Sequence, residues 1–201
     1  MRRKTEARRE AMLAAAAIEF SERGYDGASM SAIIARAGGS KQTLYSYFSS
    51  KEELFVEMMA QALDTHIESA YSELADENNI VTSLRYFGER YMKVRQLPEC
   101  ISLFRLAFSD KGPSNIGKIV YERGKQQGIA NIKAFLVVAM HAGKLRLADP
   151  TVAACHLLGL LDAELMDPVL LGVREPASAE EITEVVGRAV SAFLAAYGPT
   201  N

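Results

Sequence analysis

A short polar segment, Ser40 to Tyr47, holds the side chains best suited to chemistry in this chain of 201 residues. If the segment is helical, Leu44 and Phe48 share one side and leave hydrogen-bond donors and acceptors on the other. Lysine and glutamine can bind base edges, while hydroxyl groups and lysine can bind phosphates. The pattern favours a helix that reads the major groove of DNA, although the solvated face of an ordinary helical hairpin has the same composition. The outward residues are Ser40, Lys41, Gln42, Thr43, Ser46 and Tyr47.

The residues before this segment predict a helix-turn-helix. Ser29 is placed to cap a helix over residues 29–37 whose apolar side chains point inward. The pair Gly38-Gly39 stops that helix, and Ser40 can cap a second one through Tyr47. Two short helices joined by a glycine turn in under 20 residues are typical of this motif.

Longer helices flank the motif. Apolar residues recur at helical spacing over residues 5–23, and Gly24 can supply the left-handed residue that ends many helices. Ser50 with Glu53 is a capping box, which predicts a helix from residue 51 to about 75.

The rest of the chain also has helical spacing and no credible strand. Asp149-Pro150 and the capping box of Ser178 with Glu181 are helix start signals. We therefore predict an all-α fold of about nine helices, with a helix-turn-helix domain over 1–50 and a larger helical domain over 51–201. The later helices are expected at about 80–96, 98–109, 115–142, 150–171 and 178–197, the third of them with an interruption near Gly124 or Gly128.

The net charge is distributed unevenly along the chain. Its total of -2 would by itself weigh against a nucleic-acid partner. Residues 1–51, however, contain nine Lys and Arg against five Asp and Glu, which gives +4 and leaves -6 for the rest. The basic charge is thus concentrated where the motif lies. The tail Arg2-Arg3-Lys4 could reach a minor groove or phosphates, or could simply be solvated.

Cysteine content and hydropathy indicate an intracellular location. No stretch reaches the roughly 18 to 20 apolar residues of a membrane span, and the N-terminus fits an amphipathic helix better than a signal peptide. Cys100 and Cys155 lie far apart without a C-x-x-C pattern, which is typical of free thiols in a reducing compartment. We therefore expect a cytoplasmic protein.

Enzymatic chemistry has little support in the sequence. The histidines, His66, His141 and His156, have no metal-binding spacing, and packing also explains the pair Cys155-His156. Residues 112–117 are one residue too long for the G-x-S-x-G turn of serine hydrolases and lack its preceding strand. We expect no enzyme activity, no cofactor and no metal. A dimeric architectural DNA-binding protein without a ligand is an alternative.

The segment from Leu13 through Lys51 resembles the DNA-binding domain of TetR/AcrR-type bacterial transcriptional regulators. The matching elements are Phe20 with Gly24-Tyr25, Ile33, Ala37-Gly38 to Ser40, Thr43 to Phe48, and Ser50-Lys51-Glu52. The resemblance implies that the start of the second short helix contacts bases and that neighbouring residues contact the backbone. The DNA-binding residues it implies are Ser29, Ser31, Ser40, Lys41, Gln42, Thr43, Tyr45, Tyr47 and Lys51. Gly39 departs from the family, which usually has valine there, and Ala28 stands where threonine is common.

The later part of the chain, Arg105 to Gly172, resembles the C-terminal domain of the AefR-like branch through YERG, GKLR and ADPTVAACHLLGLL. The family implies an inducer pocket among the middle helices and dimerisation through the last two long ones. Pocket candidates are Tyr91, Phe104, Phe108, Phe135 and His141, although aromatics at helical spacing are more often plain core. Arg105 could bind an anion or lie on the surface.

Dimerisation also has support from the residues themselves. The helices at 150–171 and 178–197 carry apolar residues beyond one stripe, and small Gly159 and Ala163 would allow close approach. The alternative is a fully buried monomer core. The candidate interface residues are Leu157, Leu161, Leu165, Val186, Val190 and Phe193. We expect a homodimeric repressor that binds a palindromic double-stranded DNA operator and is released by a small apolar or aromatic inducer.

Overall fold

The computed structural model describes residues 2–72, 79–109 and 116–199, and its regular structure over these ranges is entirely helical. The expected all-α fold is confirmed. The expected helix end near Ala75 and most of the 112–117 motif lie outside the described residues, as do the side chains of the Arg2-Arg3-Lys4 tail and of His66.

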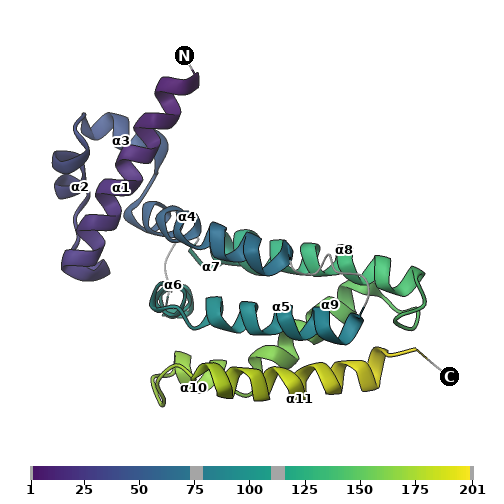
Figure 1. The fold of residues 1–201 in the computed structure, drawn as a ribbon. Coiled ribbons are helices and arrows are strands. Elements are labelled where there is room, and N and C mark those ends of the chain that lie inside the picture. Colours follow the sequence, from purple (N-terminus) through teal and green to yellow (C-terminus); the bar gives the residue numbers. More distant parts are fainter. Residues whose placement is uncertain (1, 73–78, 110–115, 200–201) are drawn as a thin grey trace.

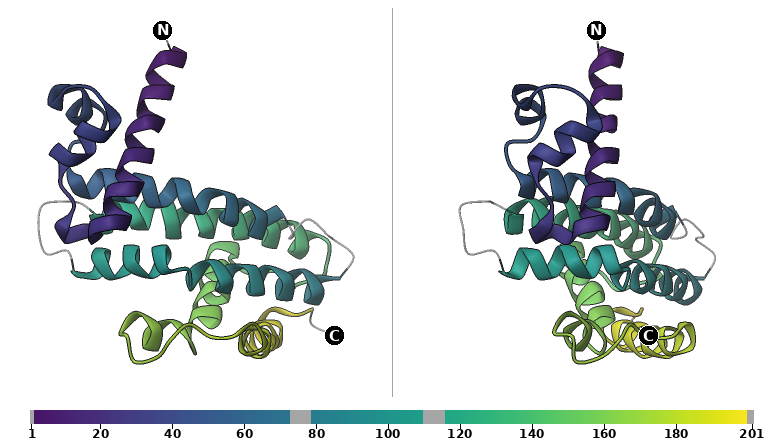
Figure 2. Two further views of the ribbon diagram at one scale, coloured as in Figure 1. Left: turned by 60° about the vertical axis from the view of Figure 1, so that its left-hand side comes forward. Right: turned by 90° about the vertical axis from the view of Figure 1, so that its left-hand side faces the viewer.

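The helices form a small N-terminal unit and a longer bundle (Figure 1). The N-terminal unit consists of α1 (Arg2–Gly27), α2 (Met30–Ala37) and α3 (Lys41–Tyr47), and it lies at the end opposite the C-terminus. In the bundle, long helices run along the molecule and α9 crosses them, as the turned views also show (Figure 2). The long helices are α4 (Lys51–Ser72), α5 (Ile80–Arg95) and α11 (Ala179–Tyr197), and the crossing helix is α9 (Pro150–Asp162).

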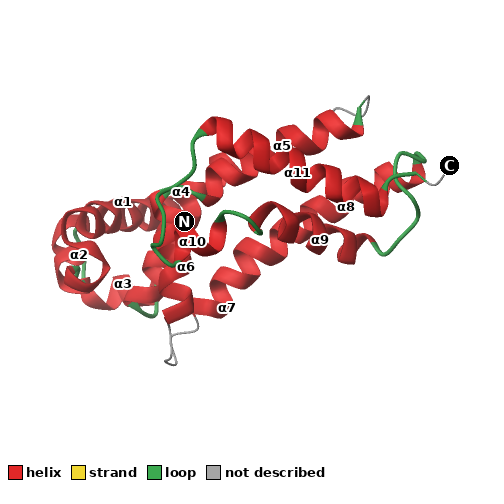
Figure 3. Ribbon diagram, turned by 90° about the horizontal axis from the view of Figure 1, so that it is seen from below, coloured by secondary structure: helices red, strands yellow, loops and turns green. Residues whose placement is uncertain are grey.

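The other helices complete the bundle, which the view from below shows along its length (Figure 3). They are α6 (Pro98–Ser109), α7 (Ile116–Val120), the π-helical segment η2 (Tyr121–Gln126), α8 (Gln127–His141) and α10 (Met166–Leu170). None of the described helices is long and apolar enough to span a membrane.

Capping residues begin several helices where the sequence predicts them. Ser29 accepts a hydrogen bond from the Ala32 backbone N–H at 3.2 Å, and Ser40 accepts one from Thr43 at 3.1 Å. Each bond satisfies an N–H that the first helical turn would otherwise leave unpaired. The caps Asn79, Asp149 and Ser178 begin α5, α9 and α11 in the same way.

Gly24 interrupts α1 as the sequence predicts. Its backbone has φ 66° and ψ 175°, so the last residues of α1 follow a kink. A positive φ is cheap for glycine because it has no Cβ. The chain thereby turns toward α2.

Two predicted helices are divided in the structure. The helix expected over 150–171 ends at Asp162 and resumes at Met166, and the one expected over 115–142 contains η2, which includes Gly124. Arg105 stabilises the segment that resumes at Met166, because its guanidinium donates to the Val169 and Leu170 carbonyls at 2.8 and 2.9 Å. Arg105 is thus a helix C-cap, and the expectation that it could bind an anion has no support from its geometry.

Two hydrophobic clusters hold these helices together. One lies among α5, α8, α9 and α11 and includes Phe87 and Phe193. The other contains the core of α1 to α4, with Ile33 and Leu44, and also Cys100 of α6. The core of the helix-turn-helix is therefore continuous with α6 and α7 through α4, and the expected boundary at residue 50 stays a prediction.

Candidate nucleic-acid interface

The second short helix, α3, is attached to the molecule through one face. Leu44 and Phe48 are each 1% exposed, whereas Lys41, Gln42 and Tyr45 lie on the solvent side. The Lys41 ammonium lies 5.8 Å from the centre of the Tyr45 ring. The division between buried and exposed side chains is the one that the sequence predicts, and it leaves a lysine, an amide and a phenol available to a partner.

The hydroxyl groups of α3 bond mostly within the helix. The Ser40 and Thr43 hydroxyls lie 2.8 Å apart, and the Ser46 hydroxyl donates to the Thr43 carbonyl at 2.7 Å. Tyr47 is half-buried beside Phe48. These groups fix the start and end of α3, so the side chains freest to bind a partner are those of Lys41, Gln42 and Tyr45.

The orientation of α2 depends on a buried carboxylate in α1. Glu19 is 1% exposed and accepts a hydrogen bond from Arg36 Nε at 3.1 Å, and Arg23 Nε lies 3.4 Å from its other oxygen. Arg36 also pairs with Glu22. Since Arg36 lies in the last turn of α2, these pairs hold α2, and with it the turn into α3, against α1.

Lys51 makes contacts inside the protein, and its expected phosphate contact stays a prediction. Its ammonium donates to the carbonyls of Tyr25 and Ala28 at 2.8 and 3.1 Å and lies 4.5 Å from the Tyr25 ring centre. The geometry therefore favours a C-cap of α1 over the expected phosphate contact. Burial would raise the pKa of the neighbouring Glu52, but hydrogen bonds from its own backbone, Ser50 and Tyr25, with the charge of Lys51, lower it below its usual value.

A second contact joins α1 to α4. Arg9 pairs with the buried carboxylate of Glu57, and its guanidinium carbon lies 5.5 Å from the Phe48 ring centre. The arginine thus connects the first helix of the N-terminal unit, the end of α3 and the first turns of α4.

Arg8 contributes to the basic charge of the N-terminal region, but no motif in the sequence gives it a role. The side chain is exposed, and its Nη2 lies 3.3 Å from the position that a Cβ of residue 39 would occupy. Gly39 has φ 130°, which a valine would adopt only with strain. Arg8 and Lys41 make no ion pair with the described residues, so two free positive charges lie near the turn.

The expected pocket residues separate in the structure. Tyr91 and Phe104 are half-buried and lie around the Arg95–Asp162 ion pair. Phe135 packs against the first hydrophobic cluster. Phe108 is 74% exposed, and the exposed His141 ring bonds to the Val137 carbonyl. In the described part of the chain, no three His, Cys, Asp or Glu side chains gather in a way that could hold a metal ion.

The expected interface residues lie inside the single chain. All of them are 0–2% exposed within the first cluster: Leu157, Leu161, Leu165, Val186, Val190 and Phe193. Periodicity finds the most apolar face of a helix, and the chain's own core uses that face. The solvent sides of α9 and α11 carry smaller residues, such as Gly159 and Ala192.

Comparison with known proteins identifies both parts of the chain. Residues 12–58 match the family model described as bacterial regulatory proteins of the tetR family. Residues 82–199, more than half of the chain, match that of the AefR-like transcriptional repressor C-terminal domain.

Relatives agree with these family matches. The HTH-type transcriptional regulator YdgC of Bacillus subtilis (strain 168) is 30% identical over 175 residues, with 85% of each chain covered. A crystal structure of a TetR-family regulator from Mesorhizobium loti MAFF303099 has a TM-score of 0.83 at 29% identity, covering 96% of this chain and 98% of the other. The flavonoid-responsive regulator FrrA has a TM-score of 0.75 at 28% identity, covering 98% and 100%. This chain belongs to the TetR family of bacterial regulatory proteins and is a DNA-binding transcriptional regulator.

Proposed function

We propose that this regulator is a cytoplasmic repressor that binds a palindromic operator as a homodimer and leaves it when a small apolar or aromatic molecule binds. The observation that carries the proposal is the exposed face of α3, where Lys41, Gln42 and Tyr45 face solvent above buried Leu44. A helix in the major groove needs such donors and acceptors on a rigidly held surface.

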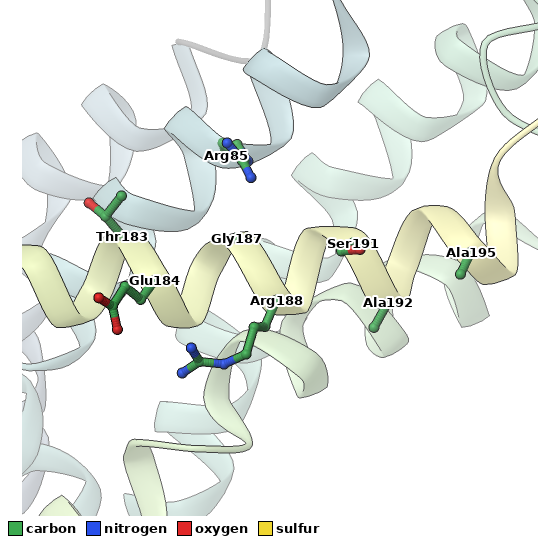
Figure 4. A pocket seen from close by; sticks show the side chains of 8 residues that line it. All are labelled: Arg85, Thr183, Glu184, Gly187, Arg188, Ser191, Ala192 and Ala195. Carbon is green, nitrogen blue, oxygen red and sulfur yellow. The ribbon is translucent and has the colours of Figure 1, made fainter.

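The second copy would pack on the solvent side of α9 and α11. The outer face of α11, with Arg85 of α5 beside it, forms an open groove lined largely by small side chains, which Figure 4 shows in close view. Small residues at four-residue spacing allow helices to approach closely, as expected for a four-helix interface. The residues that line the groove are Arg85, Thr183, Glu184, Gly187, Arg188, Ser191, Ala192 and Ala195.

Charges on this face also suit a copy of the same surface. Arg188 pairs with Glu164 at 2.7 Å within the chain, while Glu184 and Arg85 lie on the groove without an ion pair to the described residues. In a two-fold symmetric dimer, an acidic residue of each copy can face a basic residue of the other copy, so the same ion pair forms twice. The buried apolar residues named from the sequence would then support this surface from within.

The ligand part of the proposal draws on the middle helices. Tyr91 and Phe104 are half-buried on α5 and α6, where an apolar molecule would be shielded from water. The relative FrrA is described as flavonoid-responsive, which supports an aromatic inducer for this chain as well.

Operator selection tests the proposed reading face. A double K41A and Q42A variant should change the preferred base pairs, because each good base contact contributes about 1–3 kcal/mol of discrimination. The exposed Lys93 on α5 gives a control, K93A, that should leave the preference unchanged. If the double variant selected the same operator as the wild type, the reading face would lie elsewhere. If no compound in a broad screen changed operator affinity, the chain would be a ligand-independent DNA-binding protein.

A further inference from the structure

Arg95, the last residue of α5, lies where the two hydrophobic clusters meet. Its side chain is 12% exposed. Tyr91, one turn earlier, packs against the first cluster, and Phe104 of α6 packs against the second. The guanidinium carbon of Arg95 lies 4.1 Å from the centre of the Phe104 ring. A molecule bound beside this group would therefore touch both clusters.

Only part of the guanidinium group is bonded. Nε and Nη2 donate to the two carboxylate oxygens of Asp162, each at 3.3 Å, and the Tyr91 hydroxyl donates to the same carboxylate at 3.3 Å. Nη1 is buried and has no hydrogen-bond partner in the part of the chain that the structure describes. Buried donors nearly always have an acceptor, so Nη1 is open to an acceptor that comes from outside the chain.

The neighbouring thiol does not replace that acceptor. Cys100 is 4% exposed and faces the guanidinium group. Burial raises the pKa of this thiol, and the charge of Arg95 together with a hydrogen bond from its guanidinium group opposes the rise only in part. Cys100 is therefore uncharged at neutral pH, and an uncharged sulfur is a weak acceptor.

Charge decides which kind of oxygen fits. Asp162 already balances the charge of Arg95. A second carboxylate buried here would lose its hydration without gaining a full counter-charge. An uncharged carbonyl oxygen can accept from Nη1 without that penalty.

We propose that Nη1 of Arg95 donates to the carbonyl oxygen of an uncharged aromatic ligand whose body lies beside Phe104 and Tyr91. The proposal rests on the proposed function, since it names the chemistry of the small molecule to which the regulator responds. Phe104 belongs to the cluster that contains the core of the helix-turn-helix. Since α6 packs against α4, a ligand in contact with Phe104 would be connected to α1 and α3 through one continuous core.

The test uses the purified full chain and three probes of similar size. Acetophenone carries the carbonyl oxygen, ethylbenzene has no oxygen, and benzoate carries a charge. We expect calorimetry to show that acetophenone binds on the order of tenfold more tightly than either other probe. R95K keeps a positive charge opposite Asp162 but lacks Nη1, so the preference should fall below about twofold. R90K makes the same change on the same helix and should keep the preference.

Four results would overturn the proposal: equal affinity for acetophenone and ethylbenzene, binding of neither, tighter binding of benzoate, or an unchanged preference in R95K. If R95K does not fold, the wild-type comparison of the probes decides alone. Operator binding without any probe separates the two proposals. A wild type that binds no palindromic operator contradicts the proposed function, whereas one that binds it but does not prefer acetophenone contradicts only the role of Arg95.

Discussion

At the scale of single residues, the two cysteines differ in their surroundings. Cys100 is buried, whereas Cys155 is exposed in the single chain. Burial raises the pKa of Cys100, so its reactive thiolate form is scarce, and the reagent must also wait for the protein to open. In a C155S variant, Cys100 should therefore react with a disulfide reagent at pH 8 at least on the order of a hundredfold more slowly than in denaturant. Native and denatured reaction rates that agree within about tenfold would show that α6 is not packed as described.

Lys51 allows a structural role to be separated from a DNA contact. The K51M variant removes the hydrogen bonds to the Tyr25 and Ala28 carbonyls, so the free energy of unfolding should fall by about 1–2 kcal/mol. A phosphate contact, in contrast, adds about 0.9 to the slope of log affinity against log salt. We expect urea unfolding to show the stability loss and operator titrations to show an unchanged salt slope. A salt slope of operator binding that is smaller by about one unit in K51M would show that Lys51 makes the phosphate contact that the family resemblance implies.

At the scale of elements, the position of α2 depends on Glu19. The E19Q variant keeps the shape of the side chain but removes the buried charge that Arg36 and Arg23 face. The free energy of unfolding should fall by about 1–3 kcal/mol, because Glu19 loses its charge-assisted bond to Arg36 while both arginines keep their contact with solvent. E22Q removes the more exposed partner of Arg36 and should cost less than about 1 kcal/mol. Equal losses in the two variants, measured by urea denaturation, would show that burial of Glu19 does not matter.

The elements themselves were largely predictable because their boundaries have local causes. Ser29, Ser40 and Asp149 cap helices through their own side chains, and Gly24 ends one through its own backbone. The break between Asp162 and Met166 also has a local cause, because Pro168 has no N–H to bond the carbonyl four residues earlier. Arg105, about sixty residues earlier, caps the far end of α10, and this contact is visible only in the tertiary structure.

The candidate sites follow the same division. The reading face on α3 could be predicted, because a helix of two turns with buried Leu44 leaves few choices for its outer side. The role of Lys51 could not, because its acceptors come from residues more than twenty positions earlier. The role of Arg95 could not be predicted for a similar reason, because its Nη1 is buried without a partner only when α5, α6 and α9 pack together.

At the scale of the whole molecule, the reading helix and the outer face of α11 belong to different clusters and lie on different parts of the chain. Binding two half-sites at once multiplies affinity only if a second copy holds both reading helices at a fixed spacing. Mutations on α11 should therefore weaken operator binding without touching DNA. Loss of the dimer should leave the affinity for a single half-site unchanged.

The A192R variant tests this dependence, because Ala192 lies exposed on the proposed interface and a longer side chain there has solvent around it in a single chain. An unpaired charge and a long side chain between close-packed helices should raise the dimer dissociation constant on the order of a hundredfold, as measured by sedimentation. Affinity for the full operator should fall with it. A134R, the same change on the exposed side of α8, controls for added charge. An A192R protein that is monomeric yet binds the full operator as tightly as the wild type would mean that one copy reads the operator alone.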